Sequence, residues 1–395
     1  MTTTTTGSLA SFDHVARGDA APGWVHDGVC RAWGLDAGAT AVTLIAVSEN
    51  VTFKVTVAGH PTLVVRLGRP GYAESVEHVR SELVWVDALQ KDVGVPTPSP
   101  RTGVDGDFVQ FLTDETGAAW TAVAFDFVPG TILEESLDFD GDGFASHFVE
   151  IGRVTAQLHE HARGWQVPAS FRRFAWNYSD MVGPTARWGT WGDAPLGDSD
   201  RAVVQAAETR ALELLAAVDP SPEHWGLIHG DLRPSNVMTA PSVAGGSSSG
   251  GSSSGGSSVS GGSSVSGGSS AAGGSSLGGS SSGGSGELTI IDFDDCGYGW
   301  FLYDFGAALT FYEHRPAALE MGARWLDGYR SVAPLSAADL ATAGALSMMR
   351  RLTMLGWATT HRPDALPADL WDENLPGTVE CAARFVADPL WFVRG

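Results

Sequence analysis

The chain has 395 residues, of which 43% are hydrophobic and 18% charged, so it can build a large hydrophobic interior but is too long for one compact core. Its 24 Lys and Arg residues against 46 Asp and Glu residues give a formal net charge of −22. Charge of this sign disfavours nucleic acids and anionic membranes as partners, and no apolar stretch is long enough to cross a membrane. We therefore expect two lobes or domains, with no nucleic-acid partner and no membrane partner.

The cysteine pattern indicates a reducing environment. Cys30, Cys296 and Cys381 are odd in number and widely spaced, which favours neither a disulfide framework nor a zinc site. The first residues lack the basic and apolar regions of a secretion signal. These patterns predict a cytoplasmic protein.

The first part of the chain has the pattern of a small β-rich lobe. Residues 1–22 contain helix and strand breakers and are predicted to form a disordered terminus. Residues 23–127 are predicted to form the lobe, from apolar runs separated by turn residues and one helical stretch with a buried face. The five predicted strands span 41–47, 51–57, 62–67, 108–112 and 120–127, and the helix spans 73–89.

Two opposite charges in this lobe lie in otherwise apolar patterns. Arg66 is the one cation of the third predicted strand, and Glu82 lies in the helix that follows. In kinases a basic residue of the third strand grips the phosphates and is held by a glutamate of the next helix, and we assign these roles to Arg66 and Glu82. Lys54 alternates with Phe53 and Val55, so we expect it to point to solvent.

Two connections of the lobe are candidates for nucleotide contacts. Ser48, Glu49 and Asn50 join the first two strands, where a nucleotide-covering loop would lie, although the turn contains no glycine. The fifth strand ends at Phe127 and a Val-Pro-Gly turn. We place a hinge at residues 127–132, with backbone groups that would hold the edge of an adenine.

The segment 227–236, L-I-H-G-D-L-R-P-S-N, is an apolar strand end followed by a polar loop. It presents His229, Asp231 and, five residues after the aspartate, Asn236. Phosphoryl transfer needs a carboxylate that orients the attacking hydroxyl and an oxygen ligand for a magnesium ion. The spacing of Asp231 and Asn236 is typical of a loop that supplies both.

A second polar strand end follows in the segment L-T-I-I-D-F-D-D, where the apolar run stops at Asp292. A carboxylate at the end of a strand beside a catalytic loop is a typical magnesium ligand, and we assign that role to Asp292. Asp294, two residues on, is the reserve candidate.

Residues 128–395 are predicted to form a mainly helical lobe. A stretch composed almost entirely of Gly and Ser, residues 245–286, interrupts this lobe and is predicted to be a disordered insert at the tip of a hairpin. The predicted helices span 147–161, 200–217, 301–313, 316–330, 336–357 and 370–386.

Aromatic and acidic residues of the second lobe are candidates for binding a phosphate acceptor. Trp176, Asp180 and Trp188 lie in one irregular segment, and Tyr312 lies at the end of a later helix. Aromatic faces and carboxylates suit a cationic or amine-bearing molecule. The alternative is that the tryptophans fill the core of the lobe.

These motifs occur in the order found in the aminoglycoside phosphotransferase and choline kinase-like family, which the chain resembles over residues 40–330. The specific part of the resemblance is H-G-D-L-R-P-S-N at residues 229–236 followed by I-I-D-F-D-D at residues 290–295. The turn at 48–50, the strand around Arg66, A-Q-L-H at residues 156–159 and Y-D-F-G at residues 303–306 agree with it. The chain departs from the family in having arginine where the third strand usually carries lysine, and in the Gly/Ser insert.

The resemblance implies an α+β, two-lobed protein-kinase-like fold with a five-stranded N-lobe, a helical C-lobe, and ATP and Mg²⁺ in the cleft between them. It implies transfer of the γ-phosphoryl group to a hydroxyl of a small molecule, with Asp231 as the base and His229 orienting its loop. Asn236 and Asp292 would bind the metal, and Asp304 would brace the loop.

Two other functions use the same motifs. The chain could be a bacterial protein Ser/Thr kinase, although the sequence has no activation segment of the eukaryotic type between Asp292 and Asp304. It could instead be a nucleotide-binding regulator without catalysis, which the presence of Asp231, Asn236 and Asp292 disfavours.

Overall fold

The computed structural model describes residues 9–71, 73–136, 143–240, 288–361, 366 and 368–394. The Gly/Ser insert predicted to be disordered, residues 245–286, and the first eight residues lie outside this described part. None of the helices in the described ranges has the length and apolar character that a membrane span requires.

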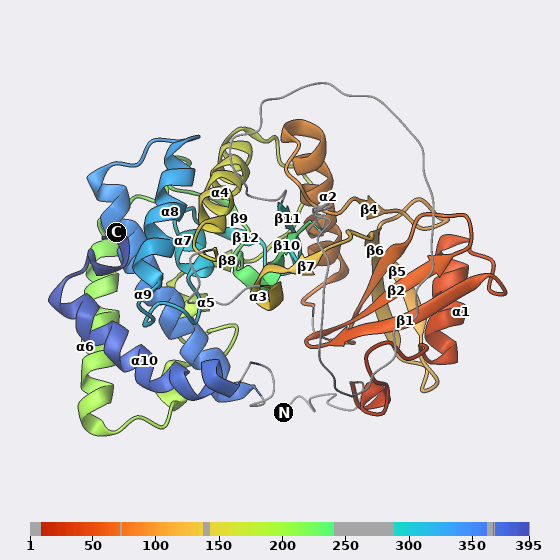
Figure 1. Ribbon diagram of the computed structural model, residues 1–395, viewed down its shortest axis with the longest axis horizontal. Helices are drawn as coiled ribbons and strands as arrows, with labels where there is room; N and C mark the ends of the chain where they lie inside the picture. Colours follow the sequence, from red (N-terminus) through yellow and green to blue (C-terminus); the bar gives the residue numbers. More distant parts are fainter. Residues whose placement is uncertain are drawn as a thin grey trace, which may run out of the picture.

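The N-lobe is built on an antiparallel sheet, which occupies the right-hand side of Figure 1. Within the described residues it has six strands in the order β1-β2-β3-β6-β4, with β5 paired to β6. The prediction of five strands missed β4, which has only two residues and lies in a proline-rich stretch. The strands are β1 (Thr40–Val47), β2 (Asn50–Val57), β3 (Leu63–Gly68), β4 (Pro100–Arg101), β5 (Gln110–Thr113) and β6 (Ala119–Asp126).

Buried and partly exposed side chains alternate along Val51–Val55 of β2 and mark the two faces of this sheet. Val51, Phe53 and Val55 are fully buried on one face, against α1 (Gly23–Trp33) and the segment before it. The intervening residues of β2 face the opposite side, where the sheet covers the cleft between the lobes.

The N-terminal segment is packed from residue 9 onward, so the prediction of a disordered terminus over residues 1–22 is wrong for residues 9–22. Phe12, in the short helix η1 (Leu9–Phe12), is 2% exposed and contacts the rings of Phe53 and Trp120. Ala20 forms a bridge with Thr43 of β1. The buried ring of Phe12 and this bridge hold the segment against the sheet.

Helix α2 (Val76–Val93) begins three residues after the predicted start at 73 and ends four residues beyond the predicted end at 89. The hydroxyl of Ser75 caps its N-terminus by accepting a hydrogen bond from His78 N, and Gly94 ends it in the left-handed conformation at φ 67°. Glu82, 2% exposed, lies on the face of α2 that turns toward β3. These caps fix the position of Glu82 along the helix axis.

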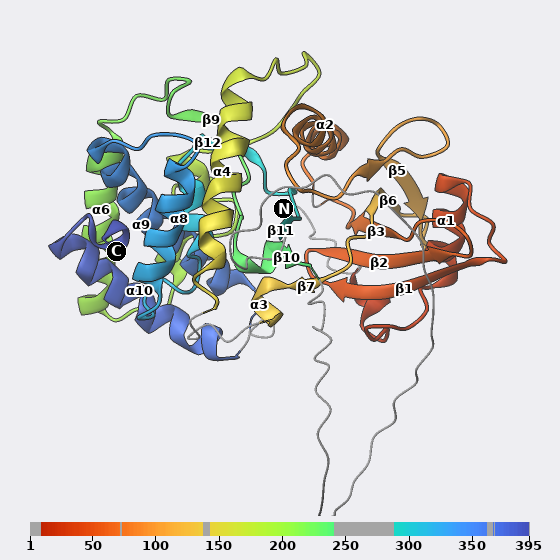
Figure 2. The same ribbon diagram turned by 45° about the horizontal axis from the view of Figure 1, so that its top comes forward.

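The C-lobe is mainly helical, and its long helices pack side by side on the left of Figures 1 and 2. Helices α4 and α8 form its most extensive helix pair, and α9 packs against α6, α7 and α10. The helices are α3 (Leu133–Ser136), α4 (His147–Gly164), α5 (Tyr178–Met181), η2 (Trp191–Asp193), α6 (Asp198–Leu215), η3 (Pro234–Asn236), α7 (Tyr303–Ala308), α8 (Ala318–Arg330), α9 (Ala337–Thr360), α10 (Ala368–Ala387) and η5 (Trp391–Val393).

Two small sheets hold the loops that face the N-lobe. One has the order β11-β10-β7 and the other the order β8-β12-β9. The loop after β9 carries Asp231, and the loop after β11 carries Asp292. The strands are β7 (Thr131–Ile132), β8 (Ala175–Trp176), β9 (Trp225–Ile228), β10 (Val237–Thr239), β11 (Leu288–Ile290) and β12 (Gly297–Trp300). The fold class is therefore the predicted one, an α+β two-lobed kinase-like fold.

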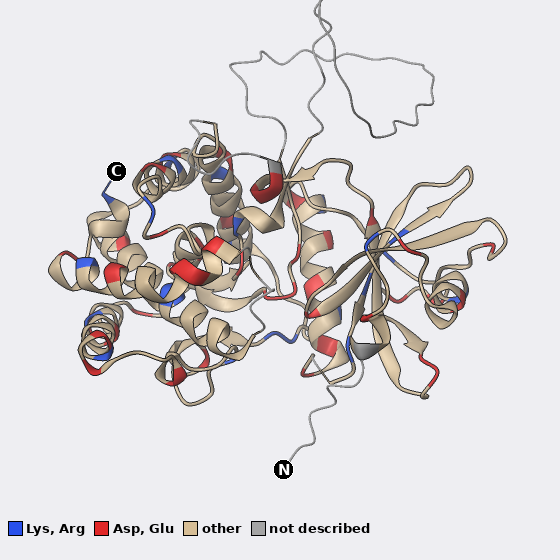
Figure 3. Ribbon diagram, turned by 60° about the horizontal axis from the view of Figure 1, so that its bottom comes forward, with Lys and Arg blue, Asp and Glu red and all other residues tan. Residues whose placement is uncertain are grey.

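Acidic residues are spread over the helices of both lobes in Figure 3. The net charge of −22 therefore does not arise from a single element.

Candidate active site

A cleft of about 620 Å³ separates the two lobes. Residues of β1, β2 and β3 cover it, the connection from β6 to β7 closes one end, and Met238, Ile291 and Phe293 of the C-lobe line the opposite wall. The predicted hinge residue Phe127 lines it together with Phe125, Asp126 and Val128. The lining at the hinge end combines apolar side chains with Lys54 and Asp126, and Arg66, Glu82 and Asp292 line the other end, an arrangement that suits a nucleotide.

Arg66 and Glu82 form an ion pair inside the cleft. Arg66 Nη2 donates to both carboxylate oxygens of Glu82, at 2.8 and 2.7 Å. Arg66 Nη1 also lies 3.2 Å from Asp292 Oδ1 across the cleft. A guanidinium held between two acids presents its remaining donors in a fixed direction, which suits a phosphate.

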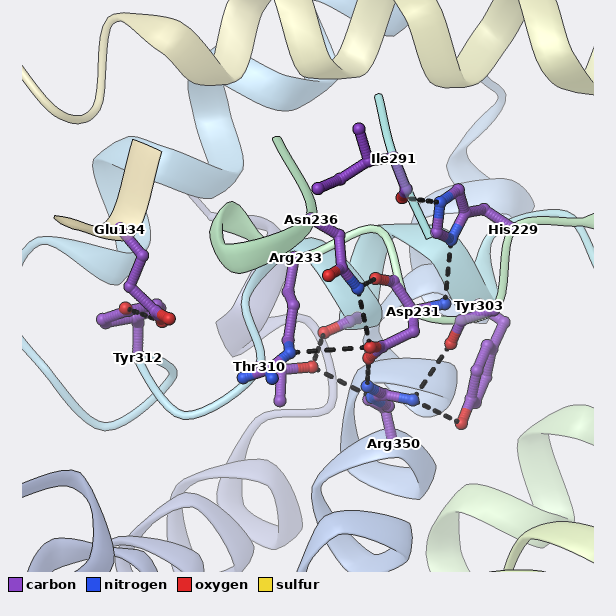
Figure 4. Close-up of polar contacts among 12 residues, drawn as sticks. Glu134, His229, Asp231, Arg233, Asn236, Ile291, Tyr303, Thr310, Tyr312 and Arg350 are labelled. Atoms are coloured by element: carbon purple, nitrogen blue, oxygen red, sulfur yellow. Dashed lines mark hydrogen bonds and ion pairs between the residues drawn. The ribbon is translucent and has the colours of Figure 1, made fainter. Parts of the chain in front are cut away.

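The side chain of Asp231 is held from three directions (Figure 4). Asn236 Nδ2 donates to Asp231 Oδ2 at 2.9 Å and to the backbone carbonyl oxygen of Asp231 at 2.8 Å. Arg350 Nη2 donates to Asp231 Oδ1, and Arg233 Nε lies 3.5 Å from Oδ2. The carboxylate is therefore oriented before any ligand arrives.

His229 supports the loop and does not face the cleft. Its Nε2 lies 3.2 Å from the carbonyl oxygen of Ile291, and its Nδ1 accepts a hydrogen bond from Asp231 N at 3.3 Å. This arrangement requires the neutral ring with its proton on Nε2, in agreement with burial, which lowers the pKa of His229.

Asp304, fully buried in α7, binds the backbone of the same loop. Its carboxylate accepts hydrogen bonds from His229 N at 3.0 Å and from Gly230 N at 2.8 Å, and His159 Nε2 lies 3.1 Å from it. Gly230 has φ 81°, and a Cβ there would lie 2.6 Å from the carbonyl oxygen of Asp295. Glycine is therefore required at this turn.

The oxygen donors beside Arg66 suit a divalent metal ion. Asp292 adopts φ 63°, rare for a non-glycine residue, which turns its carboxylate into the cleft that it lines. Desolvation, and then the neighbouring charge of Asp294, raise the pKa of Asp292 well above its ordinary value. A divalent cation would relieve this crowding, and carboxylate and amide oxygens, such as that of Asn236, are the donors it prefers. Among the described residues no cluster of three or more His, Cys, Asp or Glu forms a ready metal cage, so the donor set depends on the amide.

The turn between β1 and β2 contacts both the cleft and the C-lobe. Ser48 and Asn50 line the cleft, and Asn50 Nδ2 donates to Asp294 Oδ2 at 2.8 Å. Glu49 instead points toward the end of α9, where its Oε1 lies 3.2 Å from His361 Nε2. The hydrogen bond with His361 is the main cause that lowers the pKa of Glu49 to about 2. Glu49 was predicted as a nucleotide contact, and here it joins the two lobes.

The predicted solvent-facing orientation of Lys54 is wrong. Lys54 lines the cleft, and its Nζ lies 4.5 Å from the ring centroid of Phe127. The alternation along β2 placed Lys54 on the face opposite the core, and that face opens into the cleft.

The predicted acceptor residues divide into buried and accessible ones. Trp176 is fully buried, donates from Nε1 to the carbonyl oxygen of Asp295 at 2.8 Å and stacks on Tyr303, so it belongs to the core. Tyr312 is also fully buried and donates to Glu134 Oε1 at 2.5 Å. Neither can form the wall of a pocket in this structure.

Trp188 and Asp180 remain partly exposed. Trp188 lies 5.0 Å from the guanidinium carbon of Arg350 and packs edge-on against Trp176. Asp180 Oδ1 accepts a hydrogen bond from Thr185, away from the contacts of Asp231. Trp188 thus contacts directly the arginine that donates to Asp231.

Arg350 is the residue that sequence reasoning missed. It is fully buried in α9, and besides Asp231 it donates to the carbonyl oxygen of Gly230 at 3.0 Å and to Thr310 Oγ1 at 2.9 Å. Two adjacent arginines, Arg350 and Arg351, in an otherwise apolar helix are the signal that could have drawn attention to it.

Comparison with known proteins agrees with this geometry. The chain is similar to the microcompartment-associated aminopropanol kinase, with 30% identity, a TM-score of 0.73 and coverage of 93% of this chain and 98% of that one. It is also similar in fold to amicoumacin kinase hAmiN, solved in complex with AMP-PNP, Ca²⁺ and Ami, with 19% identity, a TM-score of 0.64 and coverage of 96% of each chain.

Amicoumacin kinase of Bacillus subtilis (strain 168) is 20% identical over 236 residues, which are 60% of this chain and 53% of that protein. The chain thus aligns with about half the length of this curated relative. A family model described as the phosphotransferase enzyme family matches residues 41–250 and 282–335, which is more than half of the chain. The chain belongs to the phosphotransferase enzyme family.

Proposed function

We propose that the protein is an ATP-dependent O-phosphotransferase that moves the γ-phosphoryl group to a hydroxyl of a small molecule. The observation that supports this most is the contact of the guanidinium of Arg66 with the carboxylate of Asp292 at 3.2 Å in the cleft, beside the pre-oriented carboxylate of Asp231, whose charge is close enough to raise the pKa of Asp292. Phosphoryl transfer depends on positioning and charge stabilisation, and these three groups are suited to both.

Each group has a separate task in the proposal. Asp231 orients the acceptor hydroxyl and accepts its proton as the oxygen attacks. Arg66, held by Glu82, binds phosphate oxygens, and Asn236 and Asp292 would hold a magnesium ion, which supplies charge neutralisation of the phosphates when bound. His229 positions Asp231 through the loop backbone.

The acceptor is proposed to be a small hydroxylated molecule that carries an amine. The chain is 30% identical to an aminopropanol kinase over nearly its whole length. Its net charge of −22 favours cationic over anionic substrates at long range. Amino alcohols are therefore the first class to test, before aminoglycosides, choline-like compounds and sugars.

The test is ADP release from ATP and Mg²⁺ with each acceptor class, with the phosphorylated product identified by ³¹P NMR. We expect acceptor-dependent release with at least one class and its loss in Asp231→Asn. Tight ATP binding without transfer to any hydroxyl, in a protein whose Asp231→Asn variant behaves like the wild type, would contradict the proposal.

A further inference from the structure

The cleft contains a cation that the proposed chemistry does not use. Only two lysines occur in the chain, Lys54 and Lys91. Lys91 Nζ pairs with Asp87 at 2.6 Å on the surface of α2, and the Lys91 side chain is 70% exposed. Lys54 is half-buried and lines the cleft, and among the described residues its ammonium has no hydrogen bond or ion pair, only the ring of Phe127 at 4.5 Å. Its three N–H donors are therefore free for a ligand.

Nearby acidic groups do not neutralise Lys54. Asp126, in the same wall of the cleft, is already bound by Arg101 at 2.7 and 2.6 Å. Glu135 also lines the cleft but is exposed on α3. An ammonium that is partly removed from water without a polar partner costs free energy, and a bound acceptor atom would remove that cost.

The strand register places Lys54 at the base end of the cleft. Lys54 pairs with Val64, whereas Thr52 pairs with Arg66, so Lys54 lies about 7 Å farther along the strand from the phosphate end. Val64, its cross-strand partner, lines the cleft together with Phe127 and Met238, and these apolar side chains suit a flat aromatic base.

The donors of Lys54 discriminate between purines. Adenine carries an amino group at position 6, which is a donor, whereas guanine and hypoxanthine carry a carbonyl oxygen there, which is an acceptor. An ammonium group has donors and no acceptor, so at position 6 it complements the oxo oxygen and not the amino group; the ring acceptor N7 is common to these purines and does not discriminate between them. Its attraction for the phosphates is common to all nucleotides and cancels in a comparison between bases.

We propose that Lys54 reads the nucleobase of the phosphoryl donor and adapts the cleft to 6-oxopurine nucleotides, GTP and ITP, in addition to ATP. This inference rests on the proposed function, of which it defines the donor. Because the contact is to the base, it acts on binding of the nucleotide and not on the chemical step.

The test is calorimetric binding of ADP, GDP and IDP to the full chain, which requires neither an acceptor nor transfer. We expect the wild type to bind all three, and Lys54→Met to weaken GDP and IDP about tenfold more than ADP, the effect of one hydrogen bond to a charged group. IDP lacks the 2-amino group of GDP, so a matching response of the two assigns the effect to the 6-oxo oxygen. Lys91→Met, the matched control, is expected to leave all three affinities unchanged, and Lys54→Arg is expected to keep the wild-type order.

Equal weakening of the three diphosphates by Lys54→Met, no change in any of them, or a wild type that binds ADP alone would overturn the inference. If Lys54→Met does not fold, Lys54→Leu, which likewise has no N–H donor, is measured in the same three titrations. Nucleotide binding with the expected order but without transfer to any acceptor would instead contradict the proposed function and leave the role of Lys54 standing.

Discussion

Replacement of Arg350 by methionine separates a role in catalysis from a role in stability. Methionine keeps much of the aliphatic stem but removes the donors to Asp231, to the carbonyl oxygen of Gly230 and to Thr310. Asp231 then keeps Asn236 as its hydrogen-bond donor, with Arg233 at 3.5 Å. We expect its carboxylate to lose its fixed orientation toward the acceptor.

Arg351 provides a matched control in the same turn of α9. Both arginines are 0% exposed, but Arg351 pairs with Glu313, which is also 0% exposed, at 2.6 Å. Loss of Arg351 leaves a fully buried carboxylate, so Arg351→Met is expected to cost about 3–5 kcal/mol of folding free energy. Arg350→Met is expected to cost about 1–3 kcal/mol, because the Asp231 side chain is 16% exposed and keeps other partners.

Catalytic activity is expected to be affected in the opposite order, with the larger loss in Arg350→Met and the smaller loss in Arg351→Met. A misplaced base costs about a hundredfold in kcat, so Arg350→Met should lower kcat by about that factor with a nearly unchanged KM for ATP. Arg351→Met should retain kcat at temperatures where it is folded. The assay is steady-state ADP release with an accepted substrate, combined with thermal unfolding of each variant. Equal loss of kcat in the two variants, or loss of kcat in proportion to loss of stability, would refute the role of Arg350 in positioning Asp231.

Three further predictions follow from the site and its surroundings. Asp292→Asn is expected to weaken Mg²⁺-dependent nucleotide binding at least about tenfold, and Asp294→Asn is expected to weaken it less. Titration calorimetry with and without Mg²⁺ measures both effects. The reverse order would move the metal site to Asp294. Replacement of residues 245–286 by a four-residue turn is expected to keep activity and to raise the free energy of unfolding by about 2 kcal/mol. The reason is that β10 and β11 already pair, and closing a short loop costs less entropy than closing a long one. An inactive but folded variant would contradict this. The pKa of Glu49 is lowered to about 2, mainly by the hydrogen bond with His361, so its contribution to stability is fully present above the ordinary pKa of glutamate and is lost as the pH falls from that pKa through about 2. Glu49→Gln should therefore lower the Tm more at about pH 6 than at about pH 3, and a constant difference would refute this.

The local motifs of the site could be predicted from the sequence because each is fixed by its own short segment. The loop of Asp231 and Asn236 closes on itself within five residues. The contact of Arg66 with Glu82 follows from a strand and the helix that comes after it. Such pairs depend on strand alternation, helix periodicity and turns, which a sequence displays directly.

The contacts that depend on distant segments could not be predicted. Arg350 reaches Asp231 across 119 positions of sequence, and no local pattern links the two. The position of Lys54 on its strand was predicted, but whether that face meets solvent or the second lobe depends on how the lobes pack. Trp176 and Trp188 look equivalent in sequence, and only packing shows that the first is fully buried and the second partly exposed.

The central claim is that Asp231 activates a hydroxyl for attack on a nucleotide bound in the cleft. The most direct measurement is single-turnover phosphoryl transfer from ATP and Mg²⁺ to an accepted amino alcohol by the wild type and by Asp231→Asn, with the ATP affinity of both measured separately. We expect the rate of transfer to fall by about two to four orders of magnitude, with ATP affinity changed less than about threefold. A comparable loss of ATP affinity and of transfer rate, or an unchanged rate, would contradict the assignment of Asp231 as the base.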